Sequence, residues 1–509
     1  MSSLATFQVP APLGYLTVRE QNSDLIAIDA QQYRKDTVPQ ELKYPEVHIT
    51  TDPRKPAVAK ESARSAFLEH DETLSKRLLR SWHEHGVTGV LEVLATNESE
   101  DKGSWLSKLA CGLLGVVRWS TALHGSLFPH LLLSSGELIA EYSTNPAWKD
   151  GVIRCLAWHP HTTKFAVALQ DDSIKVYTAS KQDIVPTLKH KLQKGVADMA
   201  WKSNSASVLA VACESCVLIW HVDPTSLATR PSTSSVQVLS QPGHLPVTSL
   251  AWSPRDGVLM SASPTQTAIM AWDVAMETSI PIRRAGGGGI SLLNWSPDGS
   301  RLCTGCPYAV IRVWETRCWT SESWSKLPGR CLSACWSPNG RTLLFTTEAE
   351  PKVFSLTFTD SLDQKKPVVG GAKDAVPVID LSEVTLESTD GPVRVGGLVQ
   401  SMVWDPTGER LAIQFKGASN DLIALFRTKV YPVLEIMPCG FIRGMPGEIP
   451  NIIRFQPKFE NGALLSVAWS SGRVSYIPLH FIPQKDVEDV YLQQNLSING
   501  HANRAFSPR

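Results

Sequence analysis

The stretch NWSPDGSRLCTGCPYAVIRVWE, from Asn294 to Glu315, decides the fold, because the chain repeats it. Its pattern predicts three short strands joined by tight turns. Pro297, Asp298 and Gly299 supply the first turn, since proline presets φ and glycine adopts a positive φ without steric cost. Ala309 to Trp314 alternates and is rich in β-branched residues, which is typical of a strand with two differently used faces. A single sheet of this kind has little apolar surface to bury. The fold is therefore indicated by the repetition of the unit along the chain.

Seven copies of this unit follow one another, and each begins with an aromatic residue that ends an apolar run. Successive first aromatics lie 43, 51, 43, 41, 68 and 51 residues apart. A period just above forty is the mark of the WD40 β-propeller, in which each unit forms one four-stranded blade. The sequence therefore predicts an all-β, seven-bladed ring. The marker aromatics are Trp158, Trp201, Trp252, Trp295, Trp336, Trp404 and Phe455.

The repeats are degenerate. A literal Trp-Asp pair closes one copy, at Trp272-Asp273, and a Gly-His pair opens one blade cleanly, at Gly243-His244. The hydrogen-bonded set of His, Ser or Thr, Asp and Trp that braces WD40 blades is therefore incomplete in most copies. The repeats predict the number of blades, seven, rather than the boundaries of any one blade.

The region before the repeats divides into two parts. Residues 1–60 are rich in Pro, Gln and charge and are expected to be mostly irregular, except for two strand-like pieces in 14–29. We expect residues 14–29 to close the ring by pairing with the last blade near Arg473 to Leu479. Residues 61–142 show apolar residues at helical spacing, which predicts a helical elaboration packed on the propeller. The alternative for this region is a partner-docking surface, centred on Leu109 to Trp119.

The propeller is expected to span residues 143–485. The longest step between marker aromatics falls over an insertion at about 359–399, which is expected to supply the outer strand of the fifth blade and a surface loop. Gly286 to Gly289 is interpreted as a flexible inter-blade loop, because a phosphate-binding loop would be followed by a helix, and a strand-like run follows here. The polar tail, 486–509, is expected to be disordered.

Composition limits the classes of partner. The chain has 509 residues, with 49 Lys and Arg against 49 Asp and Glu, so no global field draws it to nucleic acid or an anionic membrane. No secretory signal or membrane-spanning run is visible, which predicts that membrane contact is indirect. Its ten cysteines include two CxxC pairs, Cys213 with Cys216 and Cys303 with Cys306, in different blades. We interpret them as small buried thiols rather than a zinc site.

A search for chemistry yields no candidate catalytic, cofactor-binding or metal-binding residue. His83-Glu84-His85 departs from the zinc-protease helix, since the second histidine would fall at residue 87, which is valine. Walker-type loops, Gly-x-Ser-x-Gly elbows and kinase signatures are absent from the sequence. The chain is therefore expected not to be an enzyme and to need no cofactor. Which residues bind a partner is unknown; region 61–142 and the insertion at 359–399 are the two hypotheses.

Several strings are more specific than the WD-like pairs. LHGSLFPH (Leu123 to His130), AWHPHTTKFAVAL, GHLPVTSLAWSP and SMVWDPTGERLA resemble the aladin family of WD-repeat nucleoporins. The resemblance implies a non-enzymatic scaffold or adaptor subunit of the nuclear pore complex, held at the nuclear envelope through a transmembrane nucleoporin. It implies contacts with other pore subunits, support of nucleocytoplasmic transport, a mitotic role at the spindle and its poles, and a cytoplasmic location when unassembled. The chain has no Phe-Gly dipeptide, which agrees with a subunit outside the permeability barrier.

The competing hypothesis is a propeller-type substrate receptor or coat-complex adaptor, whose channel mouth captures client peptides. Such a receptor would have a charged or aromatic cluster on one rim. A scaffold would instead present one stable partner with a large, partly apolar surface, above roughly 1,200 Å². The short tail after the last blade departs from the longer tail of the family, which puts any targeting function of that tail in doubt.

Overall fold

The computed structural model describes residues 2–21, 23–33, 44–50, 133–179, 185–222, 229–233, 236–283, 288–359, 369–388, 391–417, 419–460 and 462–481. The chain divides into one unit formed by Met1–Thr50 with Ser134–Arg509, and a second formed by Thr51–Leu133. The predicted helical region 61–142 lies outside the described residues up to residue 132, and so does the tail 486–509. The described strands and helices all belong to the first unit.

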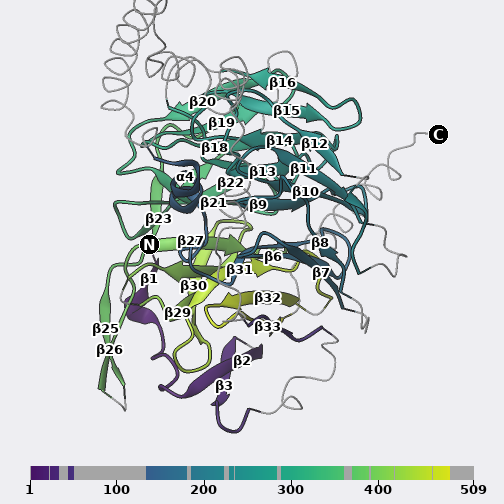
Figure 1. The fold of residues 1–509 in the computed structure, drawn as a ribbon. Helices are drawn as coiled ribbons and strands as arrows, with labels where there is room; N and C mark the ends of the chain where they lie inside the picture. Colours follow the sequence, from purple (N-terminus) through teal and green to yellow (C-terminus); the bar gives the residue numbers. More distant parts are fainter. Residues whose placement is uncertain are drawn as a thin grey trace, which may run out of the picture. The chain divides into compact units, whose positions relative to one another are not determined.

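Seven antiparallel sheets follow one another along this unit (Figure 1). We number them as blades 1 to 7. Blade 1 consists of β5 (Ile153–Trp158), β6 (Lys164–Leu169), β7 (Ile174–Thr178) and β8 (Thr187–Leu188). Blade 2 consists of β9 (Asp198–Trp201), β10 (Val208–Ala212), β11 (Val217–His221) and β12 (Gln237–Leu239). Blade 3 consists of β13 (Ser249–Trp252), β14 (Leu259–Ala262), β15 (Ile269–Asp273) and β16 (Thr278–Ile282). Blade 4 consists of β17 (Leu292–Trp295), β18 (Arg301–Gly305), β19 (Ile311–Glu315) and β20 (Thr320–Trp324).

Of the remaining three blades, the fifth and the seventh gain strands from elsewhere in the chain. Blade 5 consists of β21 (Cys331–Trp336), β22 (Thr342–Thr347), β23 (Lys352–Thr357) and β24 (Val376–Asp380). Blade 6 consists of β27 (Val399–Trp404), β28 (Arg410–Phe415), β29 (Leu422–Lys429) and β30 (Glu435–Arg443). Blade 7 consists of β31 (Pro450–Phe455), β32 (Gly462–Trp469) and β33 (Arg473–His480), completed by N-terminal strands.

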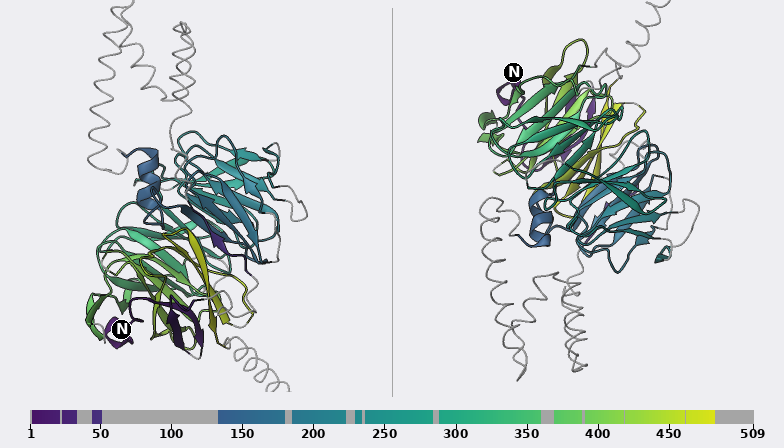
Figure 2. Two further views of the ribbon diagram at one scale, coloured as in Figure 1. Left: turned by 60° about the horizontal axis from the view of Figure 1, so that its bottom comes forward. Right: turned by 90° about the horizontal axis from the view of Figure 1, so that it is seen from above.

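The innermost strands close a ring. Each contacts the innermost strand of the next blade, in the order β5, β9, β13, β17, β21, β27 and β31, and β31 contacts β5 again. Figure 2 shows the blades side by side. Every innermost strand ends on one of the seven marker aromatics. The prediction of an all-β, seven-bladed propeller is thus confirmed.

Burial follows the position of a strand within its blade. The second strand of each blade, such as β6 (KFAVAL) and β10 (VLAVA), is buried at nearly every residue, because neighbouring blades cover both of its faces. The outermost strand β16 is largely exposed. The hydrophobic core therefore lies between blades: one cluster joins Ala166 and Val176 of blade 1 to Leu209 and Trp220 of blade 2. Each blade thus depends on its neighbours, as in other repeat folds.

Hydrogen bonds join the innermost strands of neighbouring blades. Three marker tryptophans donate their indole N–H to a carbonyl of the preceding blade: Trp201 to Ala157 (3.2 Å), Trp252 to Ala200 (3.0 Å) and Trp336 to Asn294 (3.1 Å). Three polar side chains accept the backbone N–H of the following blade: Asp198 from Leu250 (2.9 Å), Ser249 from Leu293 (3.2 Å) and Ser333 from Met402 (3.1 Å). The bonds satisfy backbone groups that face the axis rather than a sheet neighbour.

Residues 2–21, here called the N-terminal strap, contact blades 5, 6 and 7. β1 (Ser2–Ser3) pairs in parallel with β24, and the short 3₁₀ helix η1 (Leu4–Thr6) follows. β2 (Tyr15–Gln21) pairs in parallel with β33, with Glu20 opposite Leu479. β3 (Asp24–Asp29) pairs with β2, and β4 (Val47–His48) pairs with the start of β33. Strands from residues 14–29 and 47–48 therefore lie beside the last blade.

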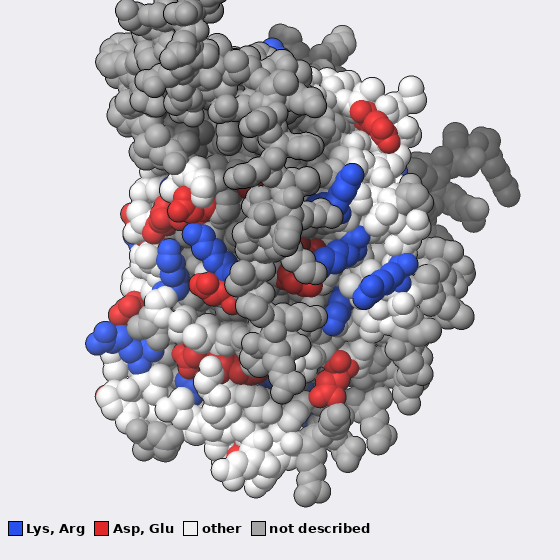
Figure 3. Space-filling view, in the orientation of Figure 1, with Lys and Arg blue, Asp and Glu red and all other residues white. Residues whose placement is uncertain are grey.

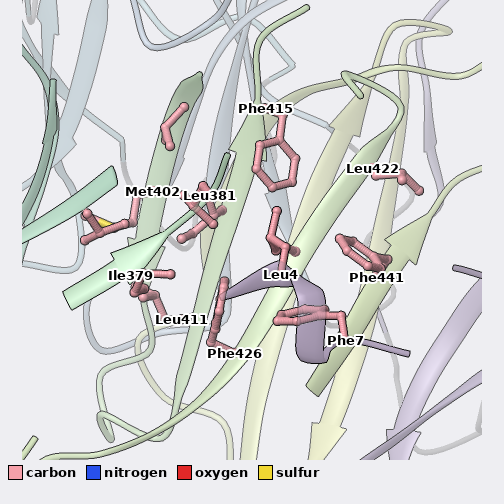
Figure 4. Close-up of a cluster of buried hydrophobic side chains, with 14 of the residues drawn as sticks. Leu4, Phe7, Ile379, Leu381, Met402, Leu411, Phe415, Leu422, Phe426 and Phe441 are labelled. Carbon is pink, nitrogen blue, oxygen red and sulfur yellow. The ribbon is translucent and has the colours of Figure 1, made fainter. Parts of the chain in front are cut away.

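The strap also inserts apolar side chains between blades 5 and 6. Leu4 is fully buried and Phe7 lies 4.9 Å from the ring centres of both Phe426 and Phe441 (Figure 4). A hairpin of β25 (Val384–Ser388) and β26 (Gly391–Val395) packs on the same cluster. Segment 359–399 thus contains the outer strand of blade 5 and this hairpin.

Candidate functional site: the axial cavity

A cavity of about 610 Å³ lies where the seven innermost strands meet. All seven blades contribute to its lining, from Arg154 of blade 1 to Arg454 of blade 7. This volume is within the range of roughly 300–1,000 Å³ that is usual for ligand pockets. The cavity is therefore the first candidate for a functional site.

The helix α4 (Ser135–Tyr142) leads into the segment that lines one end of the cavity. Glu137 accepts the backbone N–H of Ser134 at 2.9 Å, which caps the helix N-terminus. Glu141 forms an ion pair with Arg330 of the blade 4–5 connection, at 2.6 Å, and the Arg330 guanidinium lies 5.0 Å from the ring centre of Tyr142. These contacts tie the helix to the ring.

The residues after α4 continue across this end. Gln400 of blade 6 donates a hydrogen bond to the carbonyl of Thr144 (3.3 Å), and Asn145 donates to the carbonyl of Ile153 of blade 1 (2.8 Å). Tyr142, Ser143 and Thr144 line the cavity. Blades 1, 5 and 6 thus hold the segment 141–145 at one end of the cavity.

Turns that follow the innermost strands form the other end. The stretch that begins at Asn294 places Trp295 and Pro297 there, and equivalent turns place Pro338 and Pro406 beside them. Pro297 and Pro406 are exposed. Gly299 closes its turn with φ of 67°, as the sequence predicts. With Trp336, Trp404 and Phe455 also in the lining, this end is aromatic and rich in proline.

Polar groups within the cavity are held in place by the strands. The Asp198 carboxylate accepts hydrogen bonds from the backbone N–H groups of Leu250 and Met199, each at 2.9 Å. Burial raises the pKa of Asp198, and burial raises the pKa of the neighbouring Cys155 thiol to about 12. Burial likewise raises the pKa of Asp405 to about 6. Arg454 lies close enough to Asp198 to favour its ionised form.

The Gly243-His244 pair belongs to a buried network in blade 3. The His244 Nε2 atom lies 2.7 Å from the Ser261 hydroxyl, which also accepts a hydrogen bond from the Trp272 indole at 2.8 Å. His244 Nδ1 lies 2.5 Å from the side chain of Gln266, which lies in the turn between β14 and β15. Burial lowers the pKa of His244 to about 4, so the ring is neutral at pH 7. His244 therefore stabilises blade 3 through these hydrogen bonds.

The other motifs of the sequence also have structural partners. Cys213 and Cys216 flank the turn between β10 and β11, while Cys303 and Cys306 lie in and after β18 of blade 4. Among the described residues, no group of three or more His, Cys, Asp or Glu side chains is placed to hold a metal. His159 Nε2 lies 2.9 Å from the Ser205 carbonyl and joins blade 1 to blade 2.

On the face shown in Figure 3, Lys and Arg side chains are interspersed with Asp and Glu. In the part of the chain that the structure describes, no helix combines the length and apolar character needed to cross a membrane.

The sequence did not reveal the lining of the cavity. Asp198 and Arg454 occupy short strands, DMAW and PNIIRF, that otherwise read as ordinary apolar inner strands. The available signal was the single charged residue within each apolar run. Helix α4 falls at the end of the predicted helical region 61–142, yet nothing local indicated that the segment after it lines the axis.

Seven four-stranded blades around one axial cavity define the class of the protein as a seven-bladed WD40-type β-propeller. A family model described as the aladin seven-bladed propeller matches residues 134–480, and the chain belongs to this family. It is therefore a nucleoporin-like WD propeller protein.

Individual proteins and solved structures resemble the chain to different extents. Aladin of Arabidopsis thaliana is 29% identical over 414 residues, which cover 76% of this chain and 87% of the relative. The intraflagellar transport protein 80 homolog of Mus musculus is 29% identical over 181 residues, or 33% of this chain and 22% of that protein. Among solved structures, the Cps50 (Swd1) β-propeller domain of Myceliophteria thermophila has 13% identity and a TM-score of 0.48, covering 64% of this chain and 96% of that one.

Proposed function

We propose that the protein is a non-catalytic scaffold subunit of the nuclear pore complex, anchored at the nuclear envelope through a transmembrane nucleoporin. The observation that carries the proposal is the family match, which covers the whole propeller from α4 to β33. Support of nucleocytoplasmic transport, a mitotic role at the spindle poles and a cytoplasmic pool before assembly belong to the same proposal. No direct contact with nucleic acid is proposed.

Rigidity supports the scaffold role. Each blade is joined to the next by buried apolar clusters and by hydrogen bonds such as those of Trp252 and Ser333. A ring of this kind holds bound partners at fixed positions, because moving one blade would break contacts on both of its faces.

Two segments are proposed to dock the membrane nucleoporin. One is the region 61–142, of which residues 61–132 lie outside the described residues. The other is the β25–β26 hairpin in segment 359–399, whose Thr385, Glu387 and Arg394 side chains are exposed while Leu386 and Val393 pack inward. A hairpin that projects its polar face outward offers partner contacts without loss of its own packing.

A pull-down from detergent-solubilised nuclear envelopes tests the proposal and locates the site. The baits are the full-length chain, a chain lacking residues 61–132 but retaining α4, and the hairpin variant Glu387→Lys with Arg394→Glu. The matched control reverses an exposed pair on blade 1, Asp171→Lys with Lys189→Glu. We expect the full-length and control chains to recover one transmembrane nucleoporin and one of the two other baits to lose it.

The outcomes separate the hypotheses. Loss with the shortened chain places the site in residues 61–132, and loss with the hairpin variant places it on β25–β26. Equal recovery by all four baits would move the site elsewhere on the propeller. Recovery of many soluble proteins and no membrane protein would contradict the anchored scaffold and favour the client-peptide receptor.

A further inference from the structure

The outer rim of blade 1 carries positively charged side chains that the fold does not neutralise. Lys175 lies on β7, Lys191 follows β8, and Arg230 lies in the segment beside β8. In the part of the chain that the structure describes, none of these three side chains pairs with an acidic group. Lys191 and Arg230 are exposed and Lys175 is half-buried. Cations without counter-charges create a local potential that attracts an anionic partner.

Backbone pairing places the three cations close together. Lys175 lies opposite Thr187 in the register of β7 and β8, and the N–H of Thr187 donates to the carbonyl of Thr229 at 2.8 Å. Arg230, the next residue, therefore lies about two strand spacings from Lys175, or roughly 10 Å. Lys191 follows Thr187 by four residues and is at most roughly 14 Å from it. One short segment of a partner can reach all three.

The loop that presents Lys191 is held in place by a buried side chain. Gln193, which is 3% exposed, donates to the carbonyl of Asp172 at 2.6 Å and accepts the indole N–H of Trp220 at 3.0 Å. The backbone N–H of Gln193 donates to the carbonyl of His190 at 3.0 Å. Because the loop is ordered before a partner arrives, binding costs little of its conformational entropy.

The two acidic side chains of the neighbouring β6–β7 turn already have cationic partners. Asp171 pairs with Lys189 at 3.3 Å, and the two side chains are 60% and 63% exposed. Asp172 pairs with Arg154 at the axial cavity. Neither carboxylate is therefore available to Lys175, Lys191 or Arg230, and the rim keeps a net positive charge.

An acidic segment of a protein partner fits this rim best, because its carboxylates form charge-assisted hydrogen bonds with Lys and Arg. A membrane surface would also be expected to take up exposed apolar side chains. Residues 171–179, 185–194 and 229–233 expose no large hydrophobic side chain. Single-stranded nucleic acid would be expected to stack on aromatic rings, but Tyr177 is the one Phe, Tyr or Trp of these ranges and it is buried.

We propose that the outer rim of blade 1, formed by Lys175, Lys191 and Arg230, is a docking surface for an acidic segment of a protein partner. The rim lies on a different blade from the β25–β26 hairpin, so its partner is distinct from the membrane nucleoporin. Binding does not depend on attachment to the nuclear pore, and the purified chain displays it alone.

Fluorescence anisotropy with the purified full-length chain tests the proposal. The probe is a fluorescein-labelled peptide of eight glutamates, and the comparison probes are an octaserine peptide and an eight-nucleotide oligothymidine. We expect saturable binding of octaglutamate that weakens as salt is raised, and about tenfold weaker binding, or none, for octaserine. No binding of octaglutamate, or equal affinity for octaserine, would overturn the proposal. Tighter binding of the oligothymidine than of octaglutamate would overturn it in favour of nucleic acid.

Charge reversal locates the surface. Lys191→Glu with Arg230→Glu is expected to weaken octaglutamate binding about tenfold, because two attractions become repulsions. The matched control, Arg317→Glu with Lys326→Glu, changes the net charge by the same amount at two exposed positions of blade 4, one before β20 and one after it. The control is expected to keep most of the affinity. Equal loss in both double variants would show that only net charge matters and would contradict the proposal.

Asp171→Asn supplies a test in the opposite direction. It removes the negative charge that pairs with Lys189 and keeps the oxygen that accepts the N–H of Ser173 at 3.1 Å. We expect octaglutamate to bind about twofold more tightly or better, because a fourth cation joins the rim. Unchanged or weaker binding would contradict the proposal. All these side chains lie at the surface, so the melting temperatures of the variants are expected to match that of the wild type.

Discussion

Arg410 and Glu20 form a buried ion pair across 390 residues of sequence. The Arg410 Nη2 atom lies 2.6 Å from Glu20 Oε1, and the two side chains are 2% and 0% exposed. The Nε atom of Arg410 also donates to both carboxylate oxygens, at 3.1 and 2.9 Å. The pair joins β2 of the N-terminal strap to β28 of blade 6. Through this buried ion pair the N-terminal strap belongs to the core of the propeller.

Replacing Glu20 by alanine is expected to lower the free energy of unfolding by about 3–5 kcal/mol, because it leaves the Arg410 charge buried and unpaired. Urea unfolding of the full-length chain measures the change. Glu383→Ala is the control, since its partner Arg394 lies 3.8 Å away and both are exposed; its effect is expected to stay below about 1 kcal/mol. The double change Glu20→Met with Arg410→Met should recover part of the loss. Equal effects of Glu20→Ala and the control would contradict the core role of the strap.

Leu4 provides a second test of the strap. The side chain is fully buried among residues of blades 5 and 6, so Leu4→Ala is expected to cost about 2–5 kcal/mol. Leu13→Ala removes the same atoms from a side chain that is 79% exposed and is expected to change stability by about 0.5 kcal/mol or less. Thermal unfolding of the two variants measures the difference. If the strap detached in solution, Leu4→Ala and Leu13→Ala would have the same melting temperature, which would contradict this prediction.

The hydrogen bonds between blades predict local protection. Ser333 accepts the backbone N–H of Met402 at 3.1 Å and donates to its carbonyl at 3.2 Å. Ser333→Ala is expected to cost about 1–3 kcal/mol, because both backbone groups lose a buried partner. Hydrogen exchange should show faster exchange of the Met402 amide, while the exposed control Ser215→Ala leaves it unchanged. Unchanged protection in Ser333→Ala would show that the bond does not stabilise the contact of blades 5 and 6.

His244 predicts a pH dependence of stability. Burial lowers the pKa of its imidazole from 6.5 to about 4, so the unfolded chain binds a proton between these values and the folded chain does not. The stability that His244 contributes is therefore complete above pH 6.5 and is lost as the pH falls towards 4, by about 3 kcal/mol.

The measurement for His244 is the difference in unfolding free energy between the wild type and His244→Gln, at pH 7 and at pH 4. We expect this difference to shrink on acidification, since glutamine binds no proton. The exposed His161→Gln serves as control and should show a much smaller change. A wild-type advantage that stays constant with pH would contradict a neutral, buried His244.

The propeller could be predicted because its signals are local. Trp158 to Phe455 recur at a period close to one blade, and each ends an apolar run that becomes an innermost strand. The Pro297 to Gly299 turn is likewise encoded within a few residues. Local patterns of this kind are present in every copy, including those that lack the His and Asp of the hydrogen-bonded WD40 set.

The strap and the cavity could not be predicted in detail because their contacts are not local. β1 is a two-residue strand that pairs with Ile379 and Asp380. No hydrophobic periodicity in residues 1–13 predicts a strand or its partner. The indole nitrogen of Trp295 has no hydrogen-bond partner within the described ranges. The sequence does not indicate this, since the context of Trp295, NWSP, matches that of the paired Trp336, CWSP. In the fold the Trp295 ring packs edge to face against Trp319, which is 24 residues further along the chain.

The most direct test of the pore-scaffold account is super-resolution imaging of the tagged full-length chain in interphase cells, with a pore subunit labelled as reference. The account predicts discrete spots along the nuclear rim that coincide with the reference, with the surplus in the cytoplasm. A folded, full-length protein spread evenly through the cell, with no enrichment at the rim, would contradict it.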